Sequence, residues 1–326
     1  MQTMLEEEGV SGEVFNDSDR KEWFKTHGIS DYADIIPKRS HAETSFGLLY
    51  MQANPQYEYG IFIDDDTLPM DGHDFFGEHM RNLSYKGKID FVKSDKRWVN
   101  VLYQNFKRHG LYPRGYPYSM MHEKVIVESG IAKEVVCSQG LWTNIPDLDA
   151  VRILMDGNLT GQAETRTKET DFKGNFIVSP GNYLTVCSMN LAFKRQIIPV
   201  FYQLPMDDNQ WKIGRFDDIW SGIFLKRACD VLNKQIISGY PLCEHNKAPR
   251  STFKDLNAEV PALELNEHLW QILEQDDYTE TDYEKLYLHF ADILESAKIN
   301  CINADFFPYM AKKMRRWIEC LNRLKQ

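Results

Sequence analysis

The chain has 326 residues and a formal net charge of −10 at pH 7, with 43% hydrophobic and 26% charged residues, fractions typical of a folded globular protein. Because phosphate contacts need Lys and Arg side chains, so acidic a chain is a poor candidate for a nucleic-acid-binding protein. No apolar run approaches the ~20 residues of a membrane span, and the acidic opening MQTMLEEEGV has no signal core. The six isolated cysteines favour reduced thiols and a cytoplasmic location.

Short apolar runs bounded by Gly, Pro and Asn predict strands in the first 260 residues. Five such runs cover residues 59–63, 88–92, 126–127, 135–137 and 236–237, and segments with helical spacing lie between them. The chain opens with a helix-like segment at 1–9 and a strand-like one at 12–15. This alternation predicts an α/β or α+β layered domain.

Two amphipathic helices are predicted after residue 260. Apolar residues recur with a period near 3.6 over residues 281–298, where Thr281 and Glu284 are expected to form a capping box. The second helix is expected at 306–324, and its polar side carries Lys312, Lys313, Arg315, Arg316 and Arg323. We interpret this basic side as solvent-facing, with a patch for a membrane surface or a partner as the alternative.

The segment YGIFIDDD at residues 59–66 places three carboxylates directly after an apolar strand. Adjacent like charges repel one another, so they are tolerated in water or around a cation. Mg²⁺ and Mn²⁺ prefer oxygen ligands and commonly bridge carboxylates to substrate phosphates. The pattern therefore indicates a metal–diphosphate site, and the alternative is an acidic turn that caps the next helix.

Two later segments add donors of the same kind. Asp217 and Asp218 precede an apolar helical stretch, and His245 lies among polar and cationic residues in CEHNK, residues 243–247. Each has an ordinary structural explanation, because acidic residues stabilise helix N-termini and a lone histidine is more often not a ligand. The order of an Asp-x-Asp, an Asp-Asp pair and a histidine makes chance a weaker explanation.

These donors belong to longer motifs: FIDDD (62–66), RGYPYS (114–119), GLWTNIPDLDA (140–150), MNLAF (189–193), IGRFDDIWSG (213–222) and HNKA (245–248). In this order they resemble the GT-A fold of nucleotide-sugar glycosyltransferases. The resemblance is closer to one family, the reversibly glycosylated polypeptides, also known as UDP-arabinopyranose mutases. It implies an α/β fold with a GT-A-like mixed sheet flanked by helices and a C-terminal helical extension.

The resemblance also implies roles for individual residues. Asp64 and Asp66 would bracket a Mn²⁺ or Mg²⁺ ion on the diphosphate of a UDP-sugar, with His245 as a further metal or diphosphate contact. Asp217 and Asp218 would face the sugar, and Arg114 matches the arginine that the family glycosylates reversibly.

A second group of residues would bind the rest of the donor substrate. Asp65 would lie near the ribose or the metal, and Lys38 and Arg39 would meet the diphosphate. The sugar pocket would be lined by Trp142, Asn144, Asp147 and Asn190. Trp142 has core packing as its alternative, and Arg114 has an ordinary structural ion pair.

The expected chemistry begins with cleavage of an anomeric C–O bond. A divalent metal would stabilise the departing diphosphate, and a carboxylate would shield the cationic sugar centre. Attack by an acceptor gives sugar transfer, whereas recapture by the diphosphate gives pyranose–furanose isomerisation. A guanidinium stays protonated, so Arg114 is a poor nucleophile unless a carboxylate activates it.

The chain departs from the family at two points. The family segment RGYPFSLR has a second arginine seven residues after the first, where this chain has Met121. GT-A domains also open with a buried strand that holds the base, and this strand is expected to be missing here, as in a fragment or a partner-completed protein. Both departures favour the alternative of a non-catalytic subunit that binds a catalytic partner.

Length alone favours two domains, at about 150 residues each. The motifs instead predict a catalytic domain at residues 1–258 and a helical extension at 259–326. The sequence leaves open whether the chain associates with itself or with a different chain.

Overall fold

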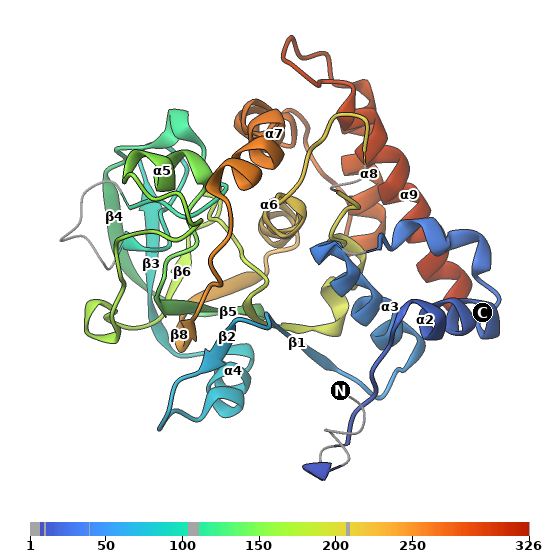
Figure 1. The fold of residues 1–326 in the computed structure, drawn as a ribbon, viewed down its shortest axis with the longest axis horizontal. Helices are drawn as coiled ribbons and strands as arrows, with labels where there is room; N and C mark the ends of the chain where they lie inside the picture. The colour runs from blue at the N-terminus through green and yellow to red at the C-terminus, as the bar shows by residue number, and fades with distance from the viewer. Residues whose placement is uncertain (1–6, 10, 39, 104–110, 207–208, 326) are drawn as a thin grey trace.

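A mixed sheet with helices on both faces organises the chain (Figure 1), and the computed structural model describes residues 7–9, 11–38, 40–103, 111–206 and 209–325. The described strands form an eight-stranded sheet in which β5 and β8, like β3 and β6, run parallel and the other neighbours antiparallel. Along the sheet the strands are β1 (Tyr59–Ile63), β7 (Asn190–Lys194), β5 (Val135–Asn144), β8 (Gln235–His245), β6 (Phe176–Val178), β3 (Lys88–Ser94) and β4 (Val125–Ile131), and β2 (Thr67–Pro69) pairs with β8. The α/β fold with a mixed sheet, expected from the motifs, is confirmed.

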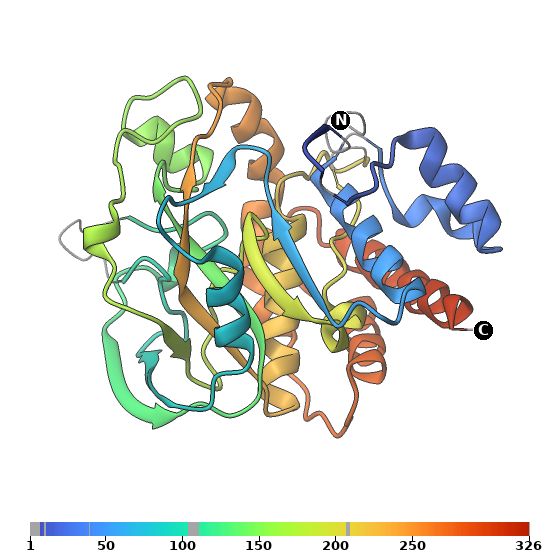
Figure 2. The same cartoon turned by 90° about the horizontal axis from the view of Figure 1, so that it is seen from below.

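The central strands β5 and β8 are longer than the sequence predicted. Their runs are interrupted by polar residues, which the interior satisfies with hydrogen bonds: Gln139 donates to the Thr185 carbonyl at 3.0 Å and accepts from Ser238 at 3.1 Å. Figures 1 and 2 show why both faces of the pair are buried, because α4 (Phe75–Leu83) covers one face and α6 (Asp217–Val231) the other.

Strand β1 forms one edge of the sheet (Figure 2), and no strand precedes it among the described residues. The prediction of a strand at 12–15 is wrong, because this segment pairs with no other strand. Its apolar end is partly buried in another way: Phe15 packs against the rings of Phe46 and Tyr50, with centroids 5.0 and 5.5 Å away.

The acidic triplet follows β1 and leads into β2, so the alternative of a turn that caps a helix is wrong. In the antiparallel ladder of β2 and β8, Thr67 lies opposite His245. The backbone N–H of Asn246 also donates to the Asp66 carbonyl at 2.7 Å. The sheet thereby brings the carboxylates of residues 64–66 to the end of β8.

The C-terminal helices are α7 (Thr252–Ile272), α8 (Tyr283–Ser296) and α9 (Phe306–Leu324), and the helix predicted at 306–324 is confirmed. Helix α9 lies beside the N-terminal helix α3 (Ser45–Ala53) in Figures 1 and 2, and α8 packs on α9. The other N-terminal helix, α2 (Asp17–Thr26), contacts η1 (Ser30–Ile35), which also contacts α9. The predicted boundary between residues 258 and 259 falls inside α7, and the division into a catalytic domain and a helical extension stays a prediction.

The cap of α8 differs from the prediction by one residue. Asp282 is the N-cap and accepts from the backbone N–H of Lys285 at 2.9 Å, so the capping box of Thr281 and Glu284 is wrong. The remaining short elements among the described residues are η1 (Ser30–Ile35), η2 (His41–Thr44), η4 (Tyr118–Met120), α5 (Ala150–Met155), η5 (Glu169–Asp171) and η6 (Arg195–Val200).

Much of the basic side of α9 is engaged in ion pairs within the chain. Lys313 and Arg316 both bind Asp34, each with a 2.8 Å contact. Arg315 binds Asp292 and the neighbouring Glu295 on α8. These pairs fix α9 against η1 and α8. In the part of the chain that the structure describes, no helix has the length and apolar character to cross a membrane.

Candidate functional site

A cavity of ≈ 150 Å³ lies where the acidic turn, the end of β8 and the start of α6 meet. It is lined by His41, Asp64, Asp66, Arg114, Asp147, Met189, Arg215, Asp217, Asp218, His245, Lys247 and Arg250. Pockets for whole drug-sized ligands usually measure roughly 300–1,000 Å³. The cavity can therefore hold a sugar or a diphosphate group, while the rest of a nucleotide-sugar would extend outside it.

Arg114 connects two of the predicted carboxylates. Its Nε donates to Asp147 at 2.9 Å, its two terminal nitrogens donate to Asp218 at 3.2 Å each, and it also contacts the Arg215 carbonyl. Gly115 has a φ of +82°, and a Cβ there would lie 2.2 Å from Ile219 of α6. Glycine thus allows the loop of Arg114 to approach α6 closely.

The Arg114 cluster keeps its charges in the folded state. Burial alone would lower the pKa of Arg114, but the charges of Asp147 and Asp218 raise it. Burial would likewise raise the pKa of Asp147, yet the nearby guanidinium holds it well below its usual range. Arg114 is therefore a protonated, fully engaged cation in this structure.

His41 is a site residue that the sequence analysis missed. Its Nδ1 lies 2.9 Å from Asp217, and its Nε2 lies 3.3 Å from both Asp64 and the Ser188 hydroxyl. Burial opposes the charged form, but the charge of Asp217 outweighs it and raises the pKa of His41 to about 11. A single histidine 176 positions before its carboxylate partner gives no sequence signal, and only the packing of η2 against α6 brings them together.

His245 and Asp66 are oriented toward one another at the end of β8. The Nδ1 of His245 lies 2.6 Å from the Ile145 carbonyl, which can only accept a hydrogen bond. In the neutral ring Nδ1 therefore carries the proton and Nε2 presents its lone pair toward Asp66, 3.6 Å away. That separation is longer than a hydrogen bond. A histidine fixed in this way is typical of metal ligands.

The donor atoms at this site fit a hard divalent cation, since carboxylate oxygens and one imidazole nitrogen suit Mg²⁺ or Mn²⁺. In the described part of the chain, His41, Asp217 and Asp218 have ligand atoms that all lie within 4.8 Å of one another. The raised pKa of His41 makes this trio an ion-paired cluster in its present form. The predicted trio of Asp64, Asp66 and His245 lines the same cavity and stays a prediction.

Several predicted residues do not line the cavity. Lys38 and Asp65 are exposed, and Arg39 lies outside the described residues. Trp142 is buried in the core. The amide of Asn144 donates to Asn246 at 3.0 Å. Their assigned roles in donor binding stay predictions.

Asn190 belongs to a buried polar network in the structure. Its oxygen lies 2.9 Å from His79, and its amide donates to the carbonyls of Leu141 and Pro241. His79 in turn contacts Ser138 at 2.9 Å. These contacts connect β7, α4 and β5, and they give Asn190 a structural role that its motif did not reveal.

Arg215, Lys247 and Arg250 are cavity cations that the sequence analysis did not single out. Arg215 donates to Glu259 at 2.6 Å, and Arg250 donates to Asp255 at 2.8 Å. Lys247 is buried, and burial lowers its pKa to about 8. Arg215 lies two positions before Asp217, and Lys247 lies two positions after His245. This closeness in sequence to predicted site residues is the signal that could have identified them.

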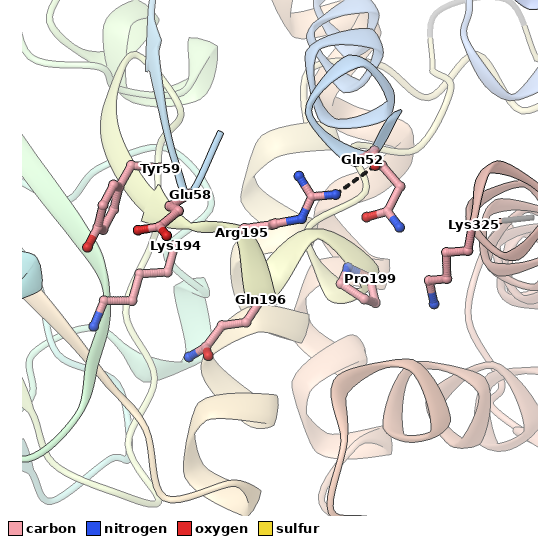
Figure 3. A pocket seen from close by; sticks show the side chains of 8 residues that line it. All are labelled: Gln52, Glu58, Tyr59, Lys194, Arg195, Gln196, Pro199 and Lys325. Atoms are coloured by element: carbon pink, nitrogen blue, oxygen red, sulfur yellow. Dashed lines mark hydrogen bonds between the residues drawn. The ribbon is translucent and has the colours of Figure 1, made fainter. Parts of the chain in front are cut away.

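A larger hollow of ≈ 480 Å³ lies at the opposite end of β1, and Figure 3 shows the side chains that line it. It is lined by Gln52, Glu58, Tyr59, Lys194, Arg195, Gln196, Pro199 and Lys325. Arg195 donates to carbonyls at the end of α3, among them that of Gln52, and Lys325 pairs with Glu284. Two of its three cations thus make structural contacts, so we assign the chemistry to the acidic cavity.

Comparisons with known proteins agree with the motifs. The model of the family described as reversibly glycosylated polypeptide matches residues 7–326. The probable UDP-arabinopyranose mutase 2 of Solanum tuberosum is 30% identical over 321 residues, which cover 97% of this chain and 79% of that protein. The UDP-arabinopyranose mutase 1 of Arabidopsis thaliana is 28% identical over 325 residues, 99% of this chain and 82% of that protein. The chain belongs to the reversibly glycosylated polypeptide family, as its motifs indicated.

Proposed function

We propose that the chain is a metal-dependent UDP-sugar mutase that interconverts the pyranose and furanose forms of UDP-arabinose. The observation that carries this proposal is the meeting of Asp64, Asp66, Asp217, Asp218 and Arg114 in one cavity. The names of the relatives, which are UDP-arabinopyranose mutases, supply the substrate.

Isomerisation requires the anomeric carbon to leave the diphosphate and to exchange its ring oxygen. When O4 replaces O5 in the ring, the C1–O4 bond forms and the C1–O5 bond breaks, O4 loses a proton and O5 gains one. The diphosphate then bonds to C1 again, so the net composition is unchanged. Asp217 is the proposed proton acceptor and donor, because its carboxylate is held at 2.9 Å by His41. Asp218, held by Arg114, is placed to shield the cationic sugar centre.

The buried walls of the cavity would keep water away from the reacting sugar. Asp217 and Asp218 are only 3% and 2% exposed. Exclusion of water would prevent hydrolysis while the anomeric carbon is free of the diphosphate. When bound, a Mn²⁺ or Mg²⁺ ion held by Asp64, Asp66 and His245 would stabilise the negative charge of the diphosphate.

Sugar transfer to Arg114 is a second outcome that we include in the proposal. Its guanidinium is fully engaged by Asp147 and Asp218, so transfer requires one of these carboxylates to take its proton. We therefore expect self-glycosylation to be slower than isomerisation. Mass spectrometry of an Arg114→Lys variant after incubation with UDP-sugar tests whether this residue carries the sugar.

A non-catalytic subunit that binds a catalytic partner is the alternative, which the sequence suggested because Met121 stands where the family has an arginine. Met121 lines a separate cavity together with Tyr112, Tyr118 and Arg152, and none of these four lines the acidic cavity. The methionine therefore removes no charge from the proposed reaction site. This supports the enzyme over the subunit.

The test is turnover by the purified chain. UDP-arabinopyranose is incubated with the protein with and without Mn²⁺, and the pyranose and furanose forms are separated by chromatography. The proposal predicts metal-dependent formation of the furanose. Release of free arabinose or its transfer to an added acceptor would instead indicate a hydrolase or a transferase, and no turnover of any UDP-sugar would favour the subunit.

A further inference from the structure

Lys247 lies at the edge of the acidic cavity, in a segment whose backbone makes several hydrogen bonds. It lies two residues beyond the end of β8, where the N–H of Asn246 donates to the backbone carbonyl of Asp66. The Lys247 carbonyl accepts from Gln162 at 2.5 Å, and the N–H of Arg250 donates to Thr160 at 2.8 Å. The backbone of this segment is thus hydrogen-bonded to residue 66 before it and to the loop of residues 160–162.

The ammonium group of Lys247 has no hydrogen-bond partner, although the residue is only 4% exposed and lines the cavity. A buried cation is costly unless it is paired, because it has lost its hydration. The carboxylate whose charge acts most strongly on Lys247 is that of Asp147, and this carboxylate already accepts a hydrogen bond from Arg114. An anionic ligand would supply the missing partner.

The other cations of the cavity are already satisfied by the protein. Arg114 is bound by two carboxylates, and His41 contacts Asp64 and Asp217. Arg215 and Arg250 bind glutamate and aspartate side chains of α7. Among the cavity cations, all of which belong to the described residues, Lys247 is the one whose side chain makes no hydrogen bond. An incoming anion therefore finds its free donor there.

The position of Lys247 selects a polyanion rather than a single carboxylate. On the neighbouring turn lies Asp66, a proposed metal ligand, joined to the lysine segment through Asn246. A carboxylate has two acceptor oxygens on one carbon, whereas a diphosphate has acceptor oxygens on two phosphoryl groups and so can contact a metal at Asp66 and the ammonium of Lys247 at the same time. A diphosphate has this chemistry, and lysine is a common point-charge partner of phosphoryl oxygens.

We propose that Lys247 is the fixed cation that binds the phosphoryl oxygens of the nucleoside diphosphate. This inference rests on the proposed function and adds to it the residue that anchors the leaving group. Lys38, predicted for this role from the sequence, is exposed and does not line the cavity. The diphosphate would thereby be oriented with its sugar toward Asp217 and Asp218.

The experiment compares Lys247→Met with the wild type and with Lys254→Met, a control lysine that is exposed on α7. Binding of UDP, inorganic pyrophosphate and uridine is measured by calorimetry in the presence of Mn²⁺, and thermal unfolding is measured without ligand. We expect Lys247→Met to weaken UDP and pyrophosphate binding roughly 10- to 150-fold, the size of a lost charge-assisted hydrogen bond. Uridine binding stays the same, and the control variant binds all three like the wild type.

Unfolding gives an independent readout of the same idea. Because methionine removes an unpaired buried charge, the ligand-free variant should have a Tm equal to or above that of the wild type. A lower Tm, or equal weakening of uridine and UDP, would assign Lys247 a structural role and overturn the inference. UDP binding within twofold of the wild type would also overturn it and leave the proposed function standing. If the wild type binds neither UDP nor pyrophosphate, the proposed function itself fails.

Discussion

Replacing His41 with glutamine removes the cation that lies between Asp64 and Asp217. In the structure the imidazolium contacts Asp217 at 2.9 Å and Asp64 at 3.3 Å. Glutamine keeps a hydrogen-bonding side chain but carries no charge. The buried carboxylate of Asp217 then loses the group that holds its position and its ionised state.

The magnitude follows from the shorter contact. The distance of 3.3 Å exceeds the usual range for an N–H···O bond, so we count one charge-assisted bond, to Asp217. Such bonds contribute about 1.5–3 kcal/mol. If the bond acts in the transition state, kcat falls roughly 10- to 150-fold, since about 1.4 kcal/mol corresponds to a factor of ten. KM for the UDP-sugar should change less.

The variant should also shift the pH profile in a defined direction. Burial favours the neutral form of Asp217, but the charge of His41 lowers the pKa of this carboxyl below its ordinary value. Without His41 the pKa rises, so the acidic limb of the kcat profile moves to higher pH. His268→Gln on α7, outside the cavity, is the matched control. An unchanged kcat and an unshifted acidic limb would refute the positioning role of His41.

Three further predictions concern the carboxylates and the caps. Asp147→Asn should destabilise the protein by roughly 3–5 kcal/mol at pH 7 in urea unfolding, because Arg114 loses a buried partner. The pKa of Asp147 is lowered in the folded state, so its contribution to the free energy of unfolding is present above about pH 4 and is lost as the pH falls below that value. A difference in stability between the wild type and this variant that stays constant below about pH 4 would contradict the prediction. Asp282→Ala should cost about 1 kcal/mol in the same assay and Thr281→Ala only a few tenths, and the reverse order would restore the capping box predicted from sequence. Asp66→Ala should abolish the Mn²⁺ dependence of UDP binding in calorimetry, and unchanged metal dependence would rule out the proposed metal site.

The elements that the sequence predicted best are those whose pattern is local. The period of apolar residues fixed α9 at Phe306–Leu324, and an apolar run followed by three carboxylates located the end of β1. The lengths of β5 and β8 were underestimated because Gln139 and Ser238 look like surface residues. Their polar groups are satisfied across the sheet, which a single segment does not reveal.

Site residues that belong to sequence motifs could be predicted. Site residues that only the tertiary packing brings to the cavity could not. Asp64, Asp217 and Arg114 were identified from separate motifs, and the structure brings them to one cavity. His41 was missed because no pattern marks it. Asn190 was predicted to bind sugar, and this role stays a prediction, while its contacts in the structure are those of a buried polar network. The presence of an asparagine in a motif does not show whether its amide binds the sugar or makes hydrogen bonds inside the protein.

The central claim is that the carboxylates at the start of α6 act on the sugar of a bound UDP-arabinose. Chromatography of the pyranose and furanose forms, with the wild type and Asp217→Asn compared at saturating substrate and Mn²⁺, tests this most directly. The account predicts conversion by the wild type, a loss of roughly 100-fold or more in the variant, and similar UDP affinity for both. Conversion by Asp217→Asn at the wild-type rate would contradict it.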